Sequence, residues 1–212
     1  MHRGRKKSAN PEAAQRILTA AERIFAARGL AGARTEEIAR AARVNKAMIY
    51  YYFESKERLY RAVFDNLFGQ ASRTIQAAMP PGASSRQAIV AFVEGHFKFR
   101  MEHPNYARLM QHMVMDNPEQ FRWVAREYFS QGFKQLTGQI KSGIAHGEFR
   151  IMNAEHTMLN IIAMIVFYFS GAPVHSVLLR RNALNPGAVA EHKQAVIDLL
   201  EHGLFRTPAR HR

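Results

Sequence analysis

The stretch TEEIARAARVNKAMIYYYFESK, from Thr35 to Lys56, holds two short apolar-periodic segments separated by a tight turn. The first segment is about two helical turns long. Asn45 can cap the second, which runs to about Phe53, because a side-chain oxygen in that position accepts an N–H from the first helical turn. Two short helices joined by a tight turn, with a supporting helix on each side, form the pattern of a helix-turn-helix.

The second short segment has two chemically distinct faces. Ile49 and Phe53 are four positions apart and are expected to face the core. Lys46, Ala47 and Tyr50 then share the opposite face. A lysine can donate to guanine acceptors in the major groove of DNA, while alanine or tyrosine can contact a thymine methyl group. This pattern predicts a recognition helix, although ordinary packing of a short tyrosine-rich helix is an open alternative.

Two residues that flank the pair are candidates for phosphate contacts. Thr35 is expected to be the N-cap of the first short helix, where free N–H groups and a hydroxyl can hold a phosphate. Lys56 lies in the first turn of the next helix, which Ser55 can cap. A cation there is unfavourable with the helix dipole, so a phosphate partner would explain it.

The chain is strongly basic, with a formal net charge of +13 over 212 residues. Residues 1–60 contain 13 Lys and Arg but only 6 Asp and Glu. This balance favours polyanionic partners, because basic side chains release counterions from phosphates. High charge for solubility alone is the alternative. Arg3, Arg5, Lys6 and Lys7 lie in a segment without periodicity, which is either a minor-groove arm or a solvated tail.

Other features limit the class of protein. The chain has no cysteine, which excludes disulfides and fits a reducing cytoplasm, and its N-terminus lacks an apolar signal core. The longest apolar run, Ile161 to Phe169, is far shorter than the roughly 20 residues that span a bilayer, so we expect a buried helix and no membrane partner. The ten histidines show no zinc-ligand spacing. Catalytic motifs are missing too, so we expect no metal, no cofactor and no enzyme activity.

Helical periodicity continues through the rest of the chain, without sustained strand alternation. We therefore predict an all-α protein of about nine helices, with an N-terminal three-helix helix-turn-helix domain and a C-terminal helical bundle. Besides the two short helices, the expected segments are Pro11 to Gly29, one from Ser55 past Ile75, Ser84 or Ser85 to Met101, Pro104 to Met115, Asn117 to Ala145, Ala154 to Ser170, and 187–203.

The segment RILTAAERIFAARGLAGARTEEIARAARVNKAMIYYYFESKERLYRAVF, Arg16 to Phe64, resembles the N-terminal domain of the TetR family of bacterial transcriptional regulators. Its most specific part is IYYYFESK, Ile49 to Lys56. The resemblance implies base contacts from Lys46, Ala47 and Tyr50. It implies contacts with the DNA backbone from Thr35, Tyr51, Tyr52 and Lys56. The predicted DNA-binding residues are Thr35, Arg43, Asn45, Lys46, Ala47, Tyr50, Tyr51, Tyr52 and Lys56.

Three of these positions depart from the family pattern. The family usually has glycine where this chain has Arg43, and a positive φ there would cost roughly 1 kcal/mol. The arginine side chain can instead reach a phosphate. The position of Tyr52 is often histidine and that of Ala47 often glycine or proline, so the base preference is open while the docking mode is not.

The resemblance also implies a division of the chain. We expect a basic arm at 1–9, a DNA-binding domain at 10–56, a connecting helix at 57–79, and a ligand-binding and dimerisation domain at 84–205. The homodimer is expected to form through about 155–170 and 187–203. The candidate lining of an adaptable apolar ligand pocket is Phe97, Met101, Met110, Met113, Phe121, Trp123, Phe129, Phe133, Met164 and Phe167.

These expectations together describe a sequence-specific transcriptional regulator. Its partners would be a palindromic double-stranded DNA operator and a small-molecule inducer that releases a repressor from it. A transcriptional activator, or a regulator that responds to a protein, would have the same DNA-binding part. A helical small-molecule-binding or catalytic protein with an incidental basic N-terminus is the alternative from another class.

Overall fold

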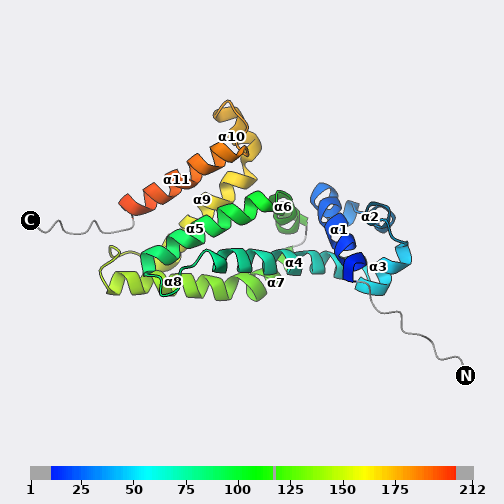
Figure 1. Ribbon diagram of the computed structural model, residues 1–212, viewed down its shortest axis with the longest axis horizontal. Helices are drawn as coiled ribbons and strands as arrows, with labels where there is room; N and C mark the ends of the chain where they lie inside the picture. Colours follow the sequence, from blue (N-terminus) through cyan, green and yellow to red (C-terminus); the bar gives the residue numbers. More distant parts are fainter. Residues whose placement is uncertain (1–10, 117, 204–212) are drawn as a thin grey trace, which may run out of the picture. The chain divides into compact units, whose positions relative to one another are not determined.

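A computed structural model describes residues 11–116 and 118–203 and confirms the all-α prediction over these residues, which contain no strand (Figure 1). The basic arm, with Arg3, Arg5, Lys6 and Lys7, lies outside the described residues. The elements are α1 (Pro11–Gly32), α2 (Thr35–Ala42), α3 (Lys46–Phe53), α4 (Lys56–Ala77), α5 (Ser85–Glu102), α6 (Tyr106–Asp116), α7 (Pro118–Val124), the π-helix η1 (Ala125–Phe129), α8 (Ser130–Ala145), α9 (Ala154–Ser170), α10 (Ala172–Leu178) and α11 (Pro186–Gly203).

The described residues divide into two compact units. The first comprises 11–67 and 108–116, and the second comprises 68–107 and 118–203. Helices α4 and α6 each contribute residues to both units. Each unit has its own buried apolar residues.

The first unit is built on an aromatic and aliphatic core. The ring of Tyr60 packs edge-on against Phe25 and Phe64, with 4.9 Å between ring centroids in both pairs. Ile38 of α2 and Ile49 of α3 are fully buried in this unit. The Arg16 guanidinium also donates from Nε to the carbonyl oxygen of Ala42 at 3.2 Å, which ties the end of α2 to α1. The two short helices are therefore held by tertiary contacts, because helices of this length are not stable on their own.

The first helix is broken at Gly29, the residue at which its end was predicted, and a short further helical segment follows. Gly29 does adopt the left-handed φ of 66° that a glycine cap requires, but α1 bends there and continues to Gly32. The glycine is also required for space, because a Cβ would lie 3.0 Å from Nδ1 of His112. A bend and a true end have the same sequence signal, since both need a residue that tolerates positive φ.

Two local features of the described helices differ from the expectation drawn from the sequence. The segment predicted as one helix from Asn117 to Ala145 is divided by the π-helix η1, in which the hydrogen bonds span five residues instead of four. A separate short helix, α10, follows the end of α9, and Pro173 lies in its first turn. Proline is well tolerated there because its missing N–H would have no partner within the helix.

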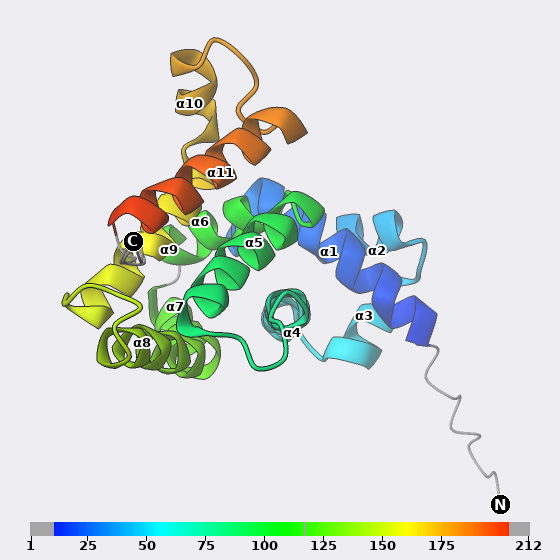
Figure 2. The ribbon, with the colours of Figure 1, turned by 60° about the vertical axis from the view of Figure 1, so that its left-hand side comes forward.

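The second unit packs α5 against α8, α9 and α11 (Figure 2). Its core includes Phe97, Met158 and Ile165, all at most 2% exposed. The start of α5 is fixed by a capping box, in which Ser84 accepts the N–H of Gln87 and the Gln87 side chain accepts the N–H of Ser84. The prediction that Ser84 or Ser85 begins this helix is confirmed in favour of Ser84 as the cap.

The apolar run at Ile161 to Phe169 is only half buried, contrary to the expectation of a buried helix. Ile161 and Ile165 face the core of the unit, whereas Phe167 is 66% exposed. Only one face of this helix packs against the core of the unit, so the apolar residues on its other face stay exposed. Over the described residues, membrane-span criteria are met by no single helix, but α9 and α10 meet them as a pair bent by 79°.

Two glycines of α8 provide a matched test of this packing. A Cβ at Gly143 would lie 2.4 Å from Cδ2 of Phe149, whereas a Cβ at Gly138 would meet no heavy atom within 4 Å. We expect Gly143→Ala to lower the free energy of unfolding by about 1–3 kcal/mol through overpacking. Gly138→Ala is expected to raise it by up to about 1 kcal/mol through helix propensity. Urea denaturation measures both, and equal effects would contradict the close approach.

Candidate nucleic-acid interface

The turn between α2 and α3 contains a left-handed residue that is not glycine. Arg43 has a φ of 56° and a ψ of 47°, and its N–H donates to the carbonyl oxygens of Ala39 and Arg40. The positive φ implied by the family pattern is therefore present, at a cost of about 1 kcal/mol relative to glycine. The Arg43 side chain is exposed, and its reach to a phosphate stays a prediction.

Helix α3 begins with the predicted cap. The side-chain oxygen of Asn45 accepts the N–H of Ala47 at 2.9 Å. Ile49 is the one fully buried residue of this helix, while Phe53, also expected in the core, is only half-buried. One inward side chain is enough to orient a two-turn helix because it fixes which face points outward.

The predicted base-contacting residues of α3 are accessible to solvent. Lys46, Ala47 and Tyr50 are all exposed, with Tyr50 at 43%. Tyr51 is 63% exposed and packs edge-on against the half-buried Tyr52, with 5.0 Å between ring centroids. The structure therefore brings these five residues onto one accessible helix, as the sequence pattern predicted.

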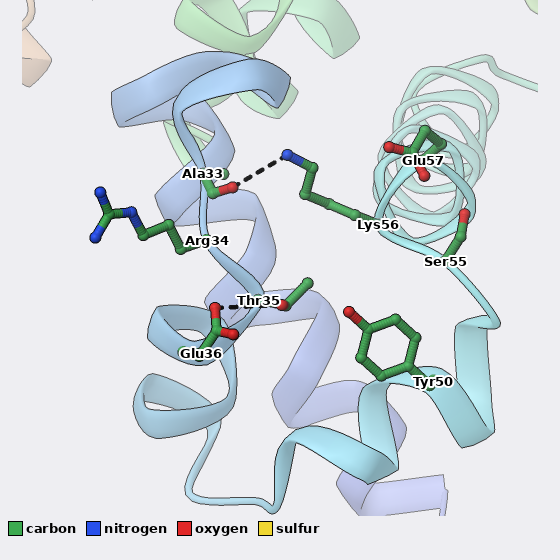
Figure 3. A pocket seen from close by; sticks show the side chains of 8 residues that line it. All are labelled: Ala33, Arg34, Thr35, Glu36, Tyr50, Ser55, Lys56 and Glu57. Carbon is green, nitrogen blue, oxygen red and sulfur yellow. Dashed lines mark hydrogen bonds between the residues drawn. The ribbon is translucent and has the colours of Figure 1, made fainter.

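An open hollow lies between the α1–α2 link, α3 and the start of α4 (Figure 3). The Lys56 ammonium donates to the carbonyl oxygen of Ala33 at 3.2 Å on one side of it. Tyr50 points its hydroxyl toward Thr35 across the hollow. An ammonium group has three N–H donors, so Lys56 retains donors for an anion after this contact. A lysine, a tyrosine hydroxyl and a helix N-terminus together make a chemically suitable phosphate site.

Ser55 caps α4 as predicted, but Thr35 does not cap α2. The side-chain oxygen of Ser55 accepts the N–H of Arg58 at 3.1 Å. The N-cap of α2 is Arg34, which has extended backbone angles and makes no side-chain capping bond. Thr35 is the first helical residue, 8% exposed, and its hydroxyl donates to Glu36 at 3.4 Å. The predicted cap was wrong because threonine fits both the N-cap and the first helical position. The proposed contact of Thr35 with phosphate is unaffected.

Sequence reasoning missed an acidic residue in this interface. Glu36 of α2 forms a hydrogen-bonded ion pair with Lys46 of α3, and both side chains are about half exposed. The hydrogen bond to Lys46 holds the pKa of Glu36 below its usual value, and the same bond raises the pKa of Lys46. A lysine that reads bases must therefore first leave this carboxylate. The two residues lie ten positions apart on different helices, a separation for which sequence periodicity gives no signal.

The predicted ligand-pocket residues are divided between the two units. Met110 and Met113 belong to the first unit. The other eight belong to the second: Phe97, Met101, Phe121, Trp123, Phe129, Phe133, Met164 and Phe167. A pocket lined by these residues stays a prediction.

Burial separates the eight residues of the second unit further. Phe97 is 2% exposed, and Phe133 and Met164 pack against the same core cluster. Met101 and Phe167 are 37% and 66% exposed, so neither lines an internal cavity of the single chain. Sequence periodicity could not separate these cases because every side of α9 carries apolar residues.

Two family profiles match this chain. The profile of the bacterial regulatory proteins of the tetR family matches residues 17–63, which contain α2, α3 and the hollow. A second profile, for the C-terminal domain of tetracyclin-repressor-like proteins, matches residues 86–200. Together they cover most of both units, and the second alone covers more than half of the chain.

Individual relatives agree with the profiles. The transcriptional repressor NicS of Pseudomonas putida is 29% identical over 202 residues, which are 90% of this chain and 91% of the relative. The transcriptional activator FasR of Mycolicibacterium smegmatis is 31% identical over 49% of this chain and 48% of its own length. A solved transcriptional regulator of Saccharomonospora viridis, in complex with choline, has a TM-score of 0.71 at 22% identity, covering 93% of this chain and 100% of that one.

Removal of the Glu36 carboxylate tests whether its ion pair competes with DNA. We expect Glu36→Gln to strengthen binding to duplex DNA a few-fold at low salt, because Lys46 then loses its internal partner and a negative charge leaves the interface. Fluorescence anisotropy with labelled DNA measures the change. Glu155→Gln is the matched control, since Glu155 pairs in the same way with Lys141 in the second unit. Equal affinities of Glu36→Gln and the parent would contradict the competition.

Proposed function

The chain belongs to the TetR family of bacterial regulatory proteins, and on this premise we propose that it represses transcription as a homodimer on a near-palindromic operator. Two protomers would place their α3 helices in successive major grooves. The observation that carries the proposal is the geometry of α3, in which one buried residue, Ile49, turns Lys46, Ala47 and Tyr50 outward beside the Lys56 hollow. No catalytic group is required for this function.

Each predicted DNA contact has a distinct role in the proposal. Lys46 and Tyr50 would read base edges, whereas Thr35 and Lys56 would hold one phosphate and set the register of the helix. The hydrogen bond from Lys56 to Ala33 supports this role, because it keeps the ammonium in the hollow before DNA arrives. Arg43 would add a phosphate contact at the other end of α3.

The proposed dimer would form through α9 and α11. Exposed apolar side chains on these helices support it, among them Leu159 and Phe167 on α9 and Leu199 on α11. On α11, Val196 and Leu200 face the core of the unit, while Leu199 is 59% exposed. Such residues in a single chain are typical of a surface that a second copy covers.

Release from the operator would follow from a small molecule bound in the second unit, within the ligand-binding region proposed at 84–205. An inducer shifts the equilibrium only by its differential affinity for the DNA-bound and released conformations. The 29% identity to a named repressor over nearly the whole chain supports repression. The partial match to a named activator makes activation the second candidate, distinguished by a reporter whose output rises in the presence of the protein.

The first experiment is selection of bound fragments from a random DNA pool, followed by affinity measurements at two salt concentrations. We expect a two-fold symmetric motif bound at least about a thousand-fold more tightly than random DNA. Tyr50→Ala should relax the base preference, and Lys56→Ala should weaken binding to all sequences and reduce the salt slope by about 0.9. Lys98→Ala, an exposed lysine of α5, is the matched control. Binding without any motif, or an unchanged slope for Lys56→Ala, would contradict the proposal.

The dimer surface is tested by a charge on its apolar face. Leu199→Glu is expected to shift the protein from dimer to monomer in light scattering and to weaken operator binding by about ten-fold or more, because burial of an unpaired carboxylate opposes association. Ile151→Glu places the same charge on another apolar residue, 87% exposed, outside α9 and α11. A dimer that survives Leu199→Glu, or is lost equally in both variants, would refute this interface.

A further inference from the structure

A buried arginine without a counter-charge lies in the second unit. Arg100, near the end of α5, is 7% exposed, and its Nε has no hydrogen-bond partner. Within the described part of the chain, it forms no ion pair with a carboxylate. Buried guanidinium groups are normally paired, because desolvation of an isolated charge is costly.

Aromatic rings surround the guanidinium. Its central carbon lies 5.0 Å from the ring centroid of Tyr106 and 5.6 Å from that of Phe169. Phe97 packs against Phe169 in turn, with 5.6 Å between ring centroids. Cation–π contacts of this kind offset part of the desolvation but satisfy none of the N–H donors. Burial lowers the pKa of Arg100, yet a guanidinium keeps its charge at any physiological pH.

A second buried polar group lies one helical turn away. Nδ1 of His96 is buried and makes no hydrogen bond of good geometry, although the nearby Phe92 backbone opposes part of the fall in the pKa of His96. Burial, together with the charge of Arg100, lowers the pKa of His96 to about 3, so the imidazole is neutral. The two residues are four apart on α5 and therefore share one helix face. This face offers N–H donors and a positive charge, but no anion that would accept from them.

We propose that Arg100 and His96 receive the carboxylate of the small-molecule inducer, and that the inducer is a monoanion with a flat apolar body. The Nε–H and one terminal N–H of arginine form a fork that matches the two oxygens of a carboxylate. The rings of Tyr106 and Phe169 would pack against the apolar body. A single guanidinium balances one negative charge in a dry site, which favours a carboxylate over a phosphate dianion. This inference rests on the proposed function and names its ligand class.

The same arrangement explains why such a ligand would shift a conformational equilibrium. In the unliganded chain the charge of Arg100 is desolvated and unpaired. A carboxylate bound in one conformation relieves this cost there and not in the other, which supplies the differential affinity that a switch requires. An uncharged analogue of the same shape makes the apolar contacts but leaves the charge unpaired, so it should shift the equilibrium less.

The first test uses the unmodified protein and pairs of small probes. Benzoate, phenylacetate and hexanoate are each compared with their amides by calorimetry and by the fluorescence of Trp123, the only tryptophan in the sequence. At least one carboxylate is expected to bind about ten-fold or more tightly than its amide, the range of a charge-assisted hydrogen-bonded pair. Equal affinity within every pair, or no binding of any carboxylate at millimolar concentration, would overturn the proposal.

The second test removes the charge or the fork. Arg100→Met should reduce carboxylate affinity by about ten-fold or more and leave amide affinity unchanged, and Arg100→Lys should fall in between because it keeps the charge but loses the fork. Lys98→Met removes an exposed cation from the same helix and should bind as the parent does. If Arg100 has a purely structural role, Arg100→Met loses thermal stability, and its carboxylate affinity is either retained or lost together with its amide affinity. Either result is the opposite of the one expected here.

The outcome is separable from that of the proposed function. Operator binding by the parent protein is measured with and without the carboxylate that binds best. Operator binding that no bound carboxylate weakens would overturn the inducer assignment and leave the DNA-binding function standing. A carboxylate that binds through Arg100 to a protein without sequence-selective DNA binding would refute the regulator instead, and the ligand would no longer be an inducer.

Discussion

The burial of one side chain, Ile49, is the constraint on which the interface depends. Helix α3 is only eight residues long, so hydrogen bonds within it cannot hold it in place, and Ile49 is its one fully buried residue. The left-handed turn at Arg43 and the Asn45 cap fix where the helix starts, and Ile49 fixes its rotation. Every outward residue of α3 inherits its direction from these three features.

The fold of the first unit could be predicted closely because its signals are local. Caps such as Asn45 and Ser55 act within one helical turn, and the stripe that includes Ile17 and Phe25 repeats at the helical period. The division of the Asn117–Ala145 segment by η1 could not be predicted, because a π-helix shifts hydrogen bonds without a distinctive residue pattern. The exposed face of α9 escaped for another reason, since its apolar residues cover every side.

The candidate sites show the same division between local and tertiary information. The exposure of Lys46, Ala47 and Tyr50 followed from helical spacing alone. The pairing of Lys46 with Glu36 depends on how α2 packs against α3, and the isolation of Arg100 depends on which carboxylates do not fold against it. The sequence shows that Arg100 lies one turn after His96 on an apolar helix. It does not show whether a carboxylate from a distant segment packs against Arg100, because that depends on the tertiary fold.

The ion pair between Glu36 and Lys46 has a kinetic consequence for any search along DNA. In the proposed interface the negative charge of Glu36 is present whatever sequence lies in the groove, so it would weaken every encounter with DNA by a similar factor, apart from the added cost of releasing Lys46 where it reads a base. A uniform weakening shortens the dwell time on each of the very many wrong sites that a genome offers. A residue that opposes binding would in this way shorten the search for the correct site, because less time would be spent on wrong ones.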